Sequence, residues 1–221
     1  MKSLFSFWLV AMWCTQVSAA VVEVFTERAL FDAAVGPTLA EDFNTFESDT
    51  PFHTSAVDVG PFTLSMTGSP LTDGTRNKID VPPLEEPVMN VDNTTVAQAL
   101  TTDGTTFLIT FEDPITAFGA DFAALNEDVD RTQIIVDGTD ILALPVTAGN
   151  TVGFFGFQTD SPFTTLEFVT SSLERPLDGY SLDNVAFSPI PIPGALWLFG
   201  SGLLGLIALS RTKEPKGSIR G

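Results

Sequence analysis

The pattern of hydrophobic and polar residues predicts short strands over most of residues 20–188. Runs rich in β-branched and aromatic residues, some alternating apolar with polar, are separated by Gly, Pro, Asn and Asp. Asp137-Gly138 predicts a tight hairpin between two of these runs. We expect strands at 21–25, 41–46, 61–66, 88–91, 105–111, 115–122, 133–136, 140–144, 152–157, 163–169 and 180–187.

One helix and one long loop interrupt this pattern. Residues 26–35 fit a short helix with Thr26 as N-cap and Gly36 as its stop. Its apolar side would consist of Ala29, Leu30, Ala33 and Ala34. Residues 67–87 are rich in Gly, Pro and Asp and predict a long loop. Together the elements predict an all-β fold, a jelly-roll-like β-sandwich with one short N-terminal helix, plus a C-terminal transmembrane helix.

The N-terminus has the layout of a secretory signal peptide. Lys2 precedes an uncharged apolar run, and small residues follow. The run is too short to span a bilayer, and we expect cleavage after Ala19 or Ala20. A lipoprotein signal that uses Cys14 is the alternative, but the bulky Trp13 before it disfavours that reading. Cleavage as expected removes the chain's single Cys.

The C-terminus combines an apolar run with a basic tail. Residues 195–209 are all apolar or small, and the tail at 211–221 has four bases and one acid. Fifteen such residues are near the lower limit for a spanning helix, and the tail favours a cytoplasmic C-terminus. A buried core helix is the alternative, but such a helix is rarely followed directly by a basic chain end.

An extended, Pro-rich segment precedes the apolar run. Alternating prolines remove the N–H donors that a helix needs. The segment consists of Pro189, Ile190, Pro191, Ile192, Pro193 and Gly194. With the following Leu-Trp-Leu-Phe-Gly-Ser-Gly-Leu-Leu-Gly-Leu at 196–206, this end resembles the PEP-CTERM sorting signals of Gram-negative bacteria, and more closely their VPLPA-type variant. The central Glu of the Pro-Glu-Pro form is missing, so the identity of the processing enzyme stays open.

The resemblance implies an exported substrate of an exosortase-type membrane protease-transpeptidase. Such proteins are held briefly by the apolar helix, cut near the Pro-rich motif and passed to the cell surface or extracellular matrix, usually beside exopolysaccharide production. The middle of the chain also resembles uncharacterised globular domains of PEP-CTERM proteins, a family without a settled activity. That second resemblance rests on residues 25–31, 41–43, 115–121, 154–157 and 182–185.

Charge excludes some functions and favours one kind of ligand. Residues 20–188 hold 27 acidic and only 5 basic side chains, which argues against nucleic acid as a partner. In a jelly roll the first and last strands usually pair. That pairing would bring acidic residues from three strands together, unpaired by bases, as oxygen ligands for a structural Ca²⁺. The predicted ligands are Glu41, Asp42, Asp121, Asp183 and Asn184. Solvated strand-end carboxylates are the alternative.

Other candidate chemistry is weaker. Asn126, Asp128 and Asp130 alternate as in a metal loop, but the EF-hand Gly and Glu are missing, so a solvated hairpin loop is expected. His53 is the single imidazole, no Ser lies in a Gly-x-Ser-x-Gly elbow, and the Cys leaves with the leader, so the usual catalytic motifs are absent. A carboxylate pair for glycoside hydrolysis is compatible with composition, but no particular pair stands out.

The sequence therefore predicts three segments: a signal peptide at 1–20, an acidic ectodomain at 21–188 and a sorting signal at 189–221. We expect a non-enzymatic protein of the envelope or matrix, structural or adhesive in an exopolysaccharide matrix. Its expected partners are signal peptidase, an exosortase-type enzyme, the membrane through the C-terminal helix, and exopolysaccharide. The alternative is a carbohydrate-binding module or glycan-active enzyme. Against it, residues 21–188 have no Trp and one Tyr for stacking on sugars.

Overall fold

The computed structural model describes residues 20–70, 76–84, 86–126, 132–147, 151–170 and 177–190. The chain divides into two compact units, Met1–Pro189 and Ile190–Gly221. Every element given below belongs to the first unit. Residues 1–19 and 191–221, which hold most of the predicted leader and sorting signal, lie outside the described residues.

Twelve strands, one α-helix and one 3-10 helix make up the described part of the first unit. The early elements are β1 (Val21–Phe25), α1 (Arg28–Val35), β2 (Leu39–Glu41), β3 (Thr50–Pro51), β4 (Val57–Asp58), β5 (Phe62–Thr67), β6 (Lys78–Asp80) and η1 (Pro87–Met89). The later ones are β7 (Val96–Thr102), β8 (Thr106–Ala123), β9 (Thr132–Val136), β10 (Asp140–Ala143), β11 (Val152–Thr170) and β12 (Leu177–Pro189). The predicted all-β class with one short N-terminal helix is confirmed.

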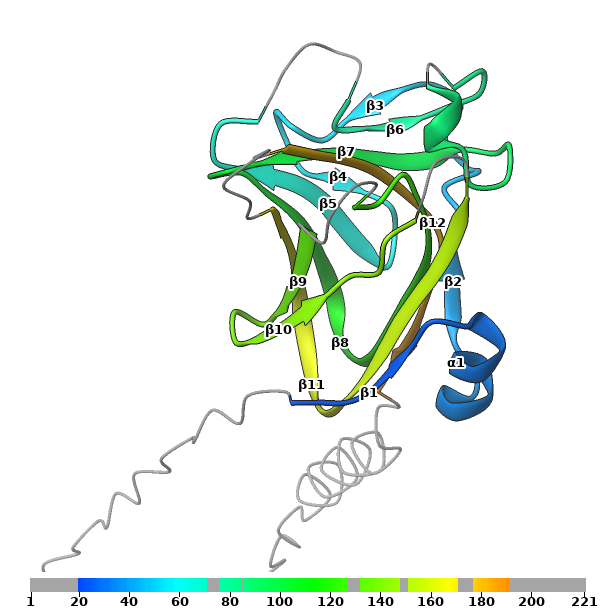
Figure 1. Ribbon diagram of the computed structural model, residues 1–221, viewed down its shortest axis with the longest axis vertical. Coiled ribbons are helices and arrows are strands. Elements are labelled where there is room, and N and C mark those ends of the chain that lie inside the picture. The colour runs from blue at the N-terminus through cyan, green and yellow to red at the C-terminus, as the bar shows by residue number, and fades with distance from the viewer. Residues whose placement is uncertain are drawn as a thin grey trace, which may run out of the picture. The chain divides into compact units, whose positions relative to one another are not determined.

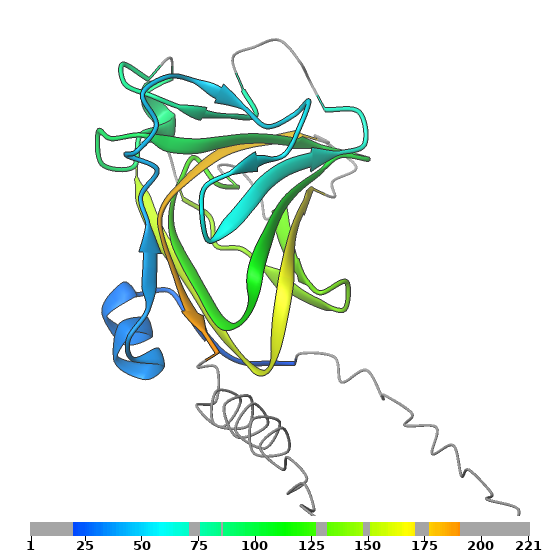
Figure 2. The same ribbon diagram turned by 180° about the vertical axis from the view of Figure 1, so that it is seen from behind.

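All the described strands belong to one antiparallel sheet that bends over into two layers (Figures 1 and 2). In one layer, the first part of β8 pairs with β5 and with the second part of β11, and β9 and β10 continue beyond β11. In the other layer, the second part of β8 lies between β12 and the first part of β11, which also pairs with β1. Beyond β12 come β7, β6 and β3.

β8 and β11 pass from one layer to the other at polar corners. In β8 the corner is Glu112-Asp113-Pro114, whose three residues are exposed between the buried Phe111 and Ile115. In β11, exposed Asp160 and Pro162 lie between the buried Thr159 and Phe163. The sequence predicted two separate strands at each place, with a turn at Glu112-Asp113-Pro114. The backbone instead stays extended and bends, because both sides of each corner keep pairing with the same neighbouring strand.

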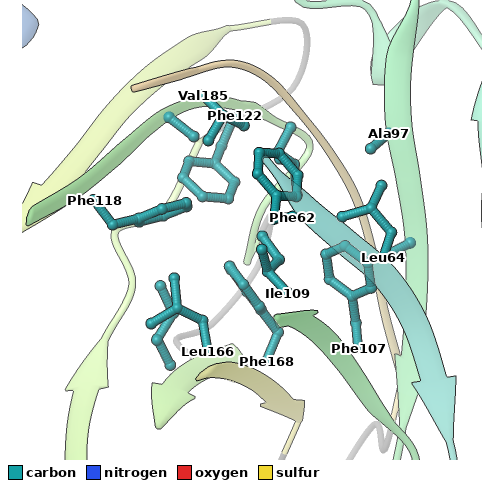
Figure 3. Packing of buried hydrophobic residues seen from close by; sticks show 14 of the residues in the cluster. Phe62, Leu64, Ala97, Phe107, Ile109, Phe118, Phe122, Leu166, Phe168 and Val185 are labelled. Atoms are coloured by element: carbon teal, nitrogen blue, oxygen red, sulfur yellow. The ribbon is translucent and has the colours of Figure 1, made fainter. Parts of the chain in front are cut away.

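Aromatic side chains fill the space between the two layers. Figure 3 shows Phe62, Phe107, Phe118, Phe122 and Phe168 pointing toward one another from opposing strands. All five are fully buried. Burial of rings of this size supplies most of the hydrophobic stabilisation of the fold.

A second, smaller apolar cluster attaches α1 to the outer face of the sheet. Phe31 of α1 packs against Phe25 of β1 and Phe154 of β11, with ring centroids 5.6 and 5.5 Å apart. Gly119 and Gly156 face each other across β8 and β11 beneath these rings. A Cβ at Gly119 would lie 2.6 Å from the ring of Phe154, and one at Gly156 would lie 2.9 Å from Phe31. Glycine at both positions therefore makes room for the helix.

The helix differs from its prediction in two respects. It begins at Arg28 with Glu27 as N-cap, and no side chain caps it, so the prediction of Thr26 as N-cap is wrong. Gly36 ends it with φ of 80°, as predicted. The buried position is Phe31, with Val35 half-buried, whereas the predicted apolar side is exposed.

Four other features differ from the prediction. Residues 88–91 overlap η1 and form no strand. The strand predicted at 41–46 lies earlier in the chain, because β2 spans Leu39–Glu41. β7 was missed because both of its faces are covered, so Val96–Thr102 lacks alternation. β6 was missed inside the predicted long loop because Lys78 and Asp80 are polar; they form a buried ion pair.

No helix in the part of the chain that the structure describes is long and apolar enough to cross a bilayer. The predicted membrane segment at 195–209 lies outside the described residues.

Candidate functional site

The predicted ligand residues lie around the point where β12 changes its neighbour from β7 to β2. We call this region the acidic edge. On one side β12 pairs with β7 as far as Leu182 and with β2 from Val185 onward. On its other side Asp183 pairs with Asp121 of β8. A register shift follows Asp183, and Asn184 has a positive φ of 51°. The bulge directs polar groups toward the gap between β7 and β2.

Asp183 is the most perturbed carboxyl group of this edge. It is fully buried, and it accepts hydrogen bonds from Asn184 N at 2.6 Å and Thr94 Oγ1 at 3.2 Å. Burial raises its pKa to about 7, and the negative charges of Asp92 and Asp42 add to the rise. The two hydrogen bonds favour the charged form but do not offset the burial. The group is therefore half protonated near neutral pH.

Thr94 stands between Asp183 and Asp92. Its hydroxyl contacts a carboxylate oxygen of both residues, and Asp92 also accepts from Thr94 N at 3.1 Å. A threonine hydroxyl has one proton to donate. When Asp183 carries a proton, both contacts are satisfied, because Asp183 donates to Thr94 while Thr94 donates to Asp92. This arrangement agrees with the raised pKa of Asp183.

Arg28 lies at the acidic edge, where the sequence predicted carboxylates without a basic partner. Its Nη2 lies 3.0 Å from Asp121 Oδ2 and donates to the backbone oxygen of Asn184 at 2.7 Å. Its guanidinium also covers the ring of Phe154, 4.7 Å from the centroid. The expectation that all these carboxylates are unpaired is therefore wrong for Asp121.

Glu41 and Asp42 use part of their oxygens locally. Glu41 Oε1 accepts from Phe43 N at 2.8 Å, and Asp42 Oδ1 accepts from Asn44 N at 3.1 Å. Burial raises the pKa of Glu41; the hydrogen bond from Phe43 opposes this and repulsion from Asp42 adds to it. Both side chains therefore bind backbone N–H groups of the turn that follows β2.

A shallow pocket of about 460 Å³ opens at this edge. It is lined by Arg28, Ala40, Asp42, Asp121 and Asn184. Among the residues that the structure describes, no group of three or more His, Cys, Asp or Glu side chains converges as a metal site would require. The pocket is thus a polar, mainly acidic hollow with one guanidinium.

Strand pairing places the five predicted residues on, or directly after, three adjacent strands: β8, β12 and β2. Asp121 faces Asp183 across β8 and β12, and Glu41 is opposite Val185 across β2 and β12. The first strand itself, β1, pairs with β11 and takes no part.

Sequence reasoning missed Arg28, Asp92 and Thr94. The signal for the latter two was the turn-forming stretch at 90–94, where Asn93 has a positive φ of 71° and its N–H bonds to Asn90 Oδ1. The segment covers β12 from outside, since Ser181 Oγ donates to the backbone oxygen of Met89. The contact between Thr94 and Asp183 joins residues that are 89 positions apart, so the sequence pattern did not reveal it.

Two other polar clusters are structural. Lys78 Nζ lies 2.6 Å from Asp49 and 3.0 Å from Asp80. Burial favours its neutral amine, but the two carboxylates outweigh this and hold the pKa of Lys78 above its ordinary value. Asn126 is fully buried, its amide donates to the backbone oxygen of Leu144, and its own N–H bonds to Asp178. It is not in a solvated loop, although residues 127–131 lie outside the described part.

The remaining predicted residues are placed as follows. His53 Nδ1 is 3.4 Å from the backbone oxygen of Asn77. Tyr180 is fully buried in the core, so its ring has no face for a sugar. Ala20, Pro189 and Ile190 are described, whereas Ala19 and the motif residues from Pro191 to Gly194 are not.

Comparison with known proteins gives a distant structural resemblance. No protein-family model matches the chain, and no curated protein matches it in sequence. The chain is similar, with a TM-score of 0.35 and 9% identity, to the crystal structure of the catalytic unit of a thermostable GH87 α-1,3-glucanase from Streptomyces thermodiastaticus strain HF3-3. The match covers 60% of this chain and 26% of that chain. A match this weak carries no argument about function.

Proposed function

We propose that the protein is exported, anchored for a time by its C-terminal apolar segment, and sorted to the cell surface or extracellular matrix, where its β domain has a structural or adhesive role. The observation that supports this most is the end of the compact unit at Pro189, where the Pro-rich motif begins. Cleavage beyond Pro189 would leave every described strand whole. The bending of β8 and β11 between two layers also supports the jelly-roll-like sandwich as the finer description of the fold.

The mass of the surface-released protein tests the sorting. We expect the full chain, expressed in a Gram-negative host with an exosortase, to reach the surface without its leader and without the residues beyond the Pro-rich motif. A variant that lacks residues 190–209 is the matched control, because it keeps β12 whole and loses the apolar segment. It should not be processed at the same site. A surface protein that retains its basic tail would contradict the proposal.

Calcium belongs to this proposal as a structural ligand of the acidic edge. Asp42, Asp92 and Asp183 repel one another there, and a cation that replaces the proton of Asp183 would relieve this repulsion. Asn184 and Thr94 would add neutral oxygens. Because Arg28 forms an ion pair with Asp121, Asp92 replaces Asp121 in the proposed ligand set.

Thermal unfolding with and without Ca²⁺ tests this ligand. At 100 times the dissociation constant, Ca²⁺ should stabilise the fold by about 2.7 kcal/mol, which raises Tm by several degrees. The rise should be larger at pH 8 than at pH 5, because Ca²⁺ competes with the proton on Asp183. Asp183→Asn should lose the pH dependence of the rise. An unchanged Tm with Ca²⁺ and with chelator at both pH values would end the calcium proposal.

The carbohydrate-binding alternative predicts a different result. A glycan array with the folded domain should remain silent if the role is structural. Selective binding that is lost in Asp42→Ala or Asn184→Ala would favour a carbohydrate-binding module that uses the pocket of about 460 Å³.

A further inference from the structure

Four large apolar side chains are exposed on β1, α1 and β2; β1 and β2 form opposite edges of the layer against which α1 packs. Val22 and Val24 of β1 are 60% and 48% exposed, Leu30 of α1 is 57% exposed, and Leu39 of β2 is 52% exposed. We refer to these four residues as the apolar end face. Exposed apolar groups that gather on one surface indicate an interaction site more often than groups scattered singly.

The helix contributes its apolar side to this surface. Phe31 points to the sheet, whereas Leu30, Ala33 and Ala34 of α1 are exposed. A groove of about 440 Å³ lies between this side of α1 and β1, lined in part by Val24 and Phe25. The sequence predicted an amphipathic helix, and the structure leaves the apolar side of that helix without a protein partner among the described residues.

The apolar end face lies at the end of the domain where β12 finishes. Pro189 of β12 pairs with Ile115 of β8, and Ile115 pairs on its other side with Phe163 of β11. Four residues before Phe163, Thr159 pairs with Val21 of β1. Leu39 is opposite Phe187, two residues before the end of β12. Both views show β1, α1 and the corners of β8 and β11 at this one end (Figures 1 and 2).

The chain length beyond Pro189 sets how far this end can be from a membrane. Residue 195, where the apolar segment begins, follows Pro189 by six positions. Six residues span at most about 20 Å when fully extended. While the segment is in the bilayer, as the proposed function requires, the end of β12 must therefore stay within about 20 Å of the lipid.

We propose that the apolar end face contacts the lipid bilayer while the protein is anchored. Acyl chains near the headgroups then enter the groove between α1 and β1. The inference rests on the membrane anchor of the proposed function. Interfacial helices bury an apolar face at the boundary of headgroups and acyl chains in this manner. Glu23, Glu27 and Asp32 lie beside the face and are exposed, so zwitterionic lipid is favoured over anionic lipid.

Tryptophan reporters can test this contact because residues 20–188 contain no Trp. The full chain without its leader, with Trp197→Phe to remove the remaining Trp, is reconstituted in phosphatidylcholine vesicles with brominated acyl chains. Val24→Trp reports on the apolar end face. The matched control is Leu177→Trp, a position that is 49% exposed and begins β12, twelve residues before Pro189. Leu30→Trp is a second reporter should Val24→Trp disturb β1.

We expect brominated lipid to quench the tryptophan emission of the Val24→Trp and Leu30→Trp chains about twofold relative to unbrominated lipid, as for a side chain at the acyl-chain boundary. The emission of the Leu177→Trp chain should stay unchanged. Addition of anionic phosphatidylglycerol should weaken the quenching at low salt.

Flotation of the vesicles separates the two ways in which the proposal can fail. Chains that float with the vesicles but show equal quenching at positions 24 and 177 would overturn the lipid contact and leave the anchor intact. Chains that do not float would overturn the anchor and the contact together. Emission at position 24 that shifts to the blue with protein concentration, without quenching, would assign the face to a second copy of the chain and overturn the lipid contact.

Discussion

Replacing Asp183 by asparagine should stabilise the fold above pH 7 and flatten its dependence on pH. The carboxyl has a pKa of about 7 in the folded state, against an ordinary value of 3.8. Between these values the folded state binds a proton that the unfolded state lacks. The free energy of unfolding should therefore fall as pH rises from about 4 through about 7, by on the order of 2–4 kcal/mol. The amide introduced by Asp183→Asn keeps an oxygen for the Asn184 N–H and cannot ionise.

Urea unfolding of the domain at pH 5, 7 and 9, without divalent cations, measures this effect. The difference between wild type and Asp183→Asn isolates it, because every other titrating group is shared. Asp103→Asn is the matched control, since Asp103 is exposed in the β7–β8 turn and should change the stability little at any pH. If the free energy of unfolding changes equally with pH in the wild type and in Asp183→Asn, Asp183 is charged in the folded state.

Phe111→Ala should produce the largest loss of stability. Phe111 lies on β8 just before the corner at Glu112, and its ring packs against Phe62 and Phe187 at 5.3 Å and against Phe118 and Phe163 at 6.4 Å. These rings come from both layers, so one substitution removes contacts across the core. Deletion of a buried phenyl ring typically costs about 3–5 kcal/mol.

The loss should appear as a lower urea midpoint with an unchanged slope, provided that unfolding stays two-state. Leu39→Ala is the control. It removes a large apolar side chain from an exposed strand position and should change the stability by less than about 0.5 kcal/mol. A similar loss for both variants would show that Phe111 does not join the two layers.

The sequence was informative where one face of an element meets the core. β5, β9, the first part of β8 and the second part of β11 were predicted because one side of each strand packs between the layers and the other is less buried. The turn after β9 was also predicted, and both Asp137 and Gly138 adopt positive φ there. Local physical chemistry was enough at these places.

Prediction failed where distant segments decide the environment. β7 is buried on both faces, and the segment around η1 folds back against the neighbouring strand β12, which no local pattern reveals. α1 was assigned the wrong buried side, because Phe31 finds its partners across the sheet at Phe25 and Phe154. The acidic edge was predicted from the placement of β2 beside β12, but Arg28 reaches it only through the docking of α1.

The position of β12 affects the order of events during synthesis and export. This strand is the last in the described domain, yet it lies inside the sheet between β8 and β7. A chain that crosses a membrane from its N-terminus therefore cannot complete its sheet until the stretch up to Pro189 has emerged. Pairings over such long sequence separations form slowly. If the chain is exported as proposed, the late arrival of a central strand would leave the sheet incomplete, and the chain competent for translocation, until nearly all of it has passed through.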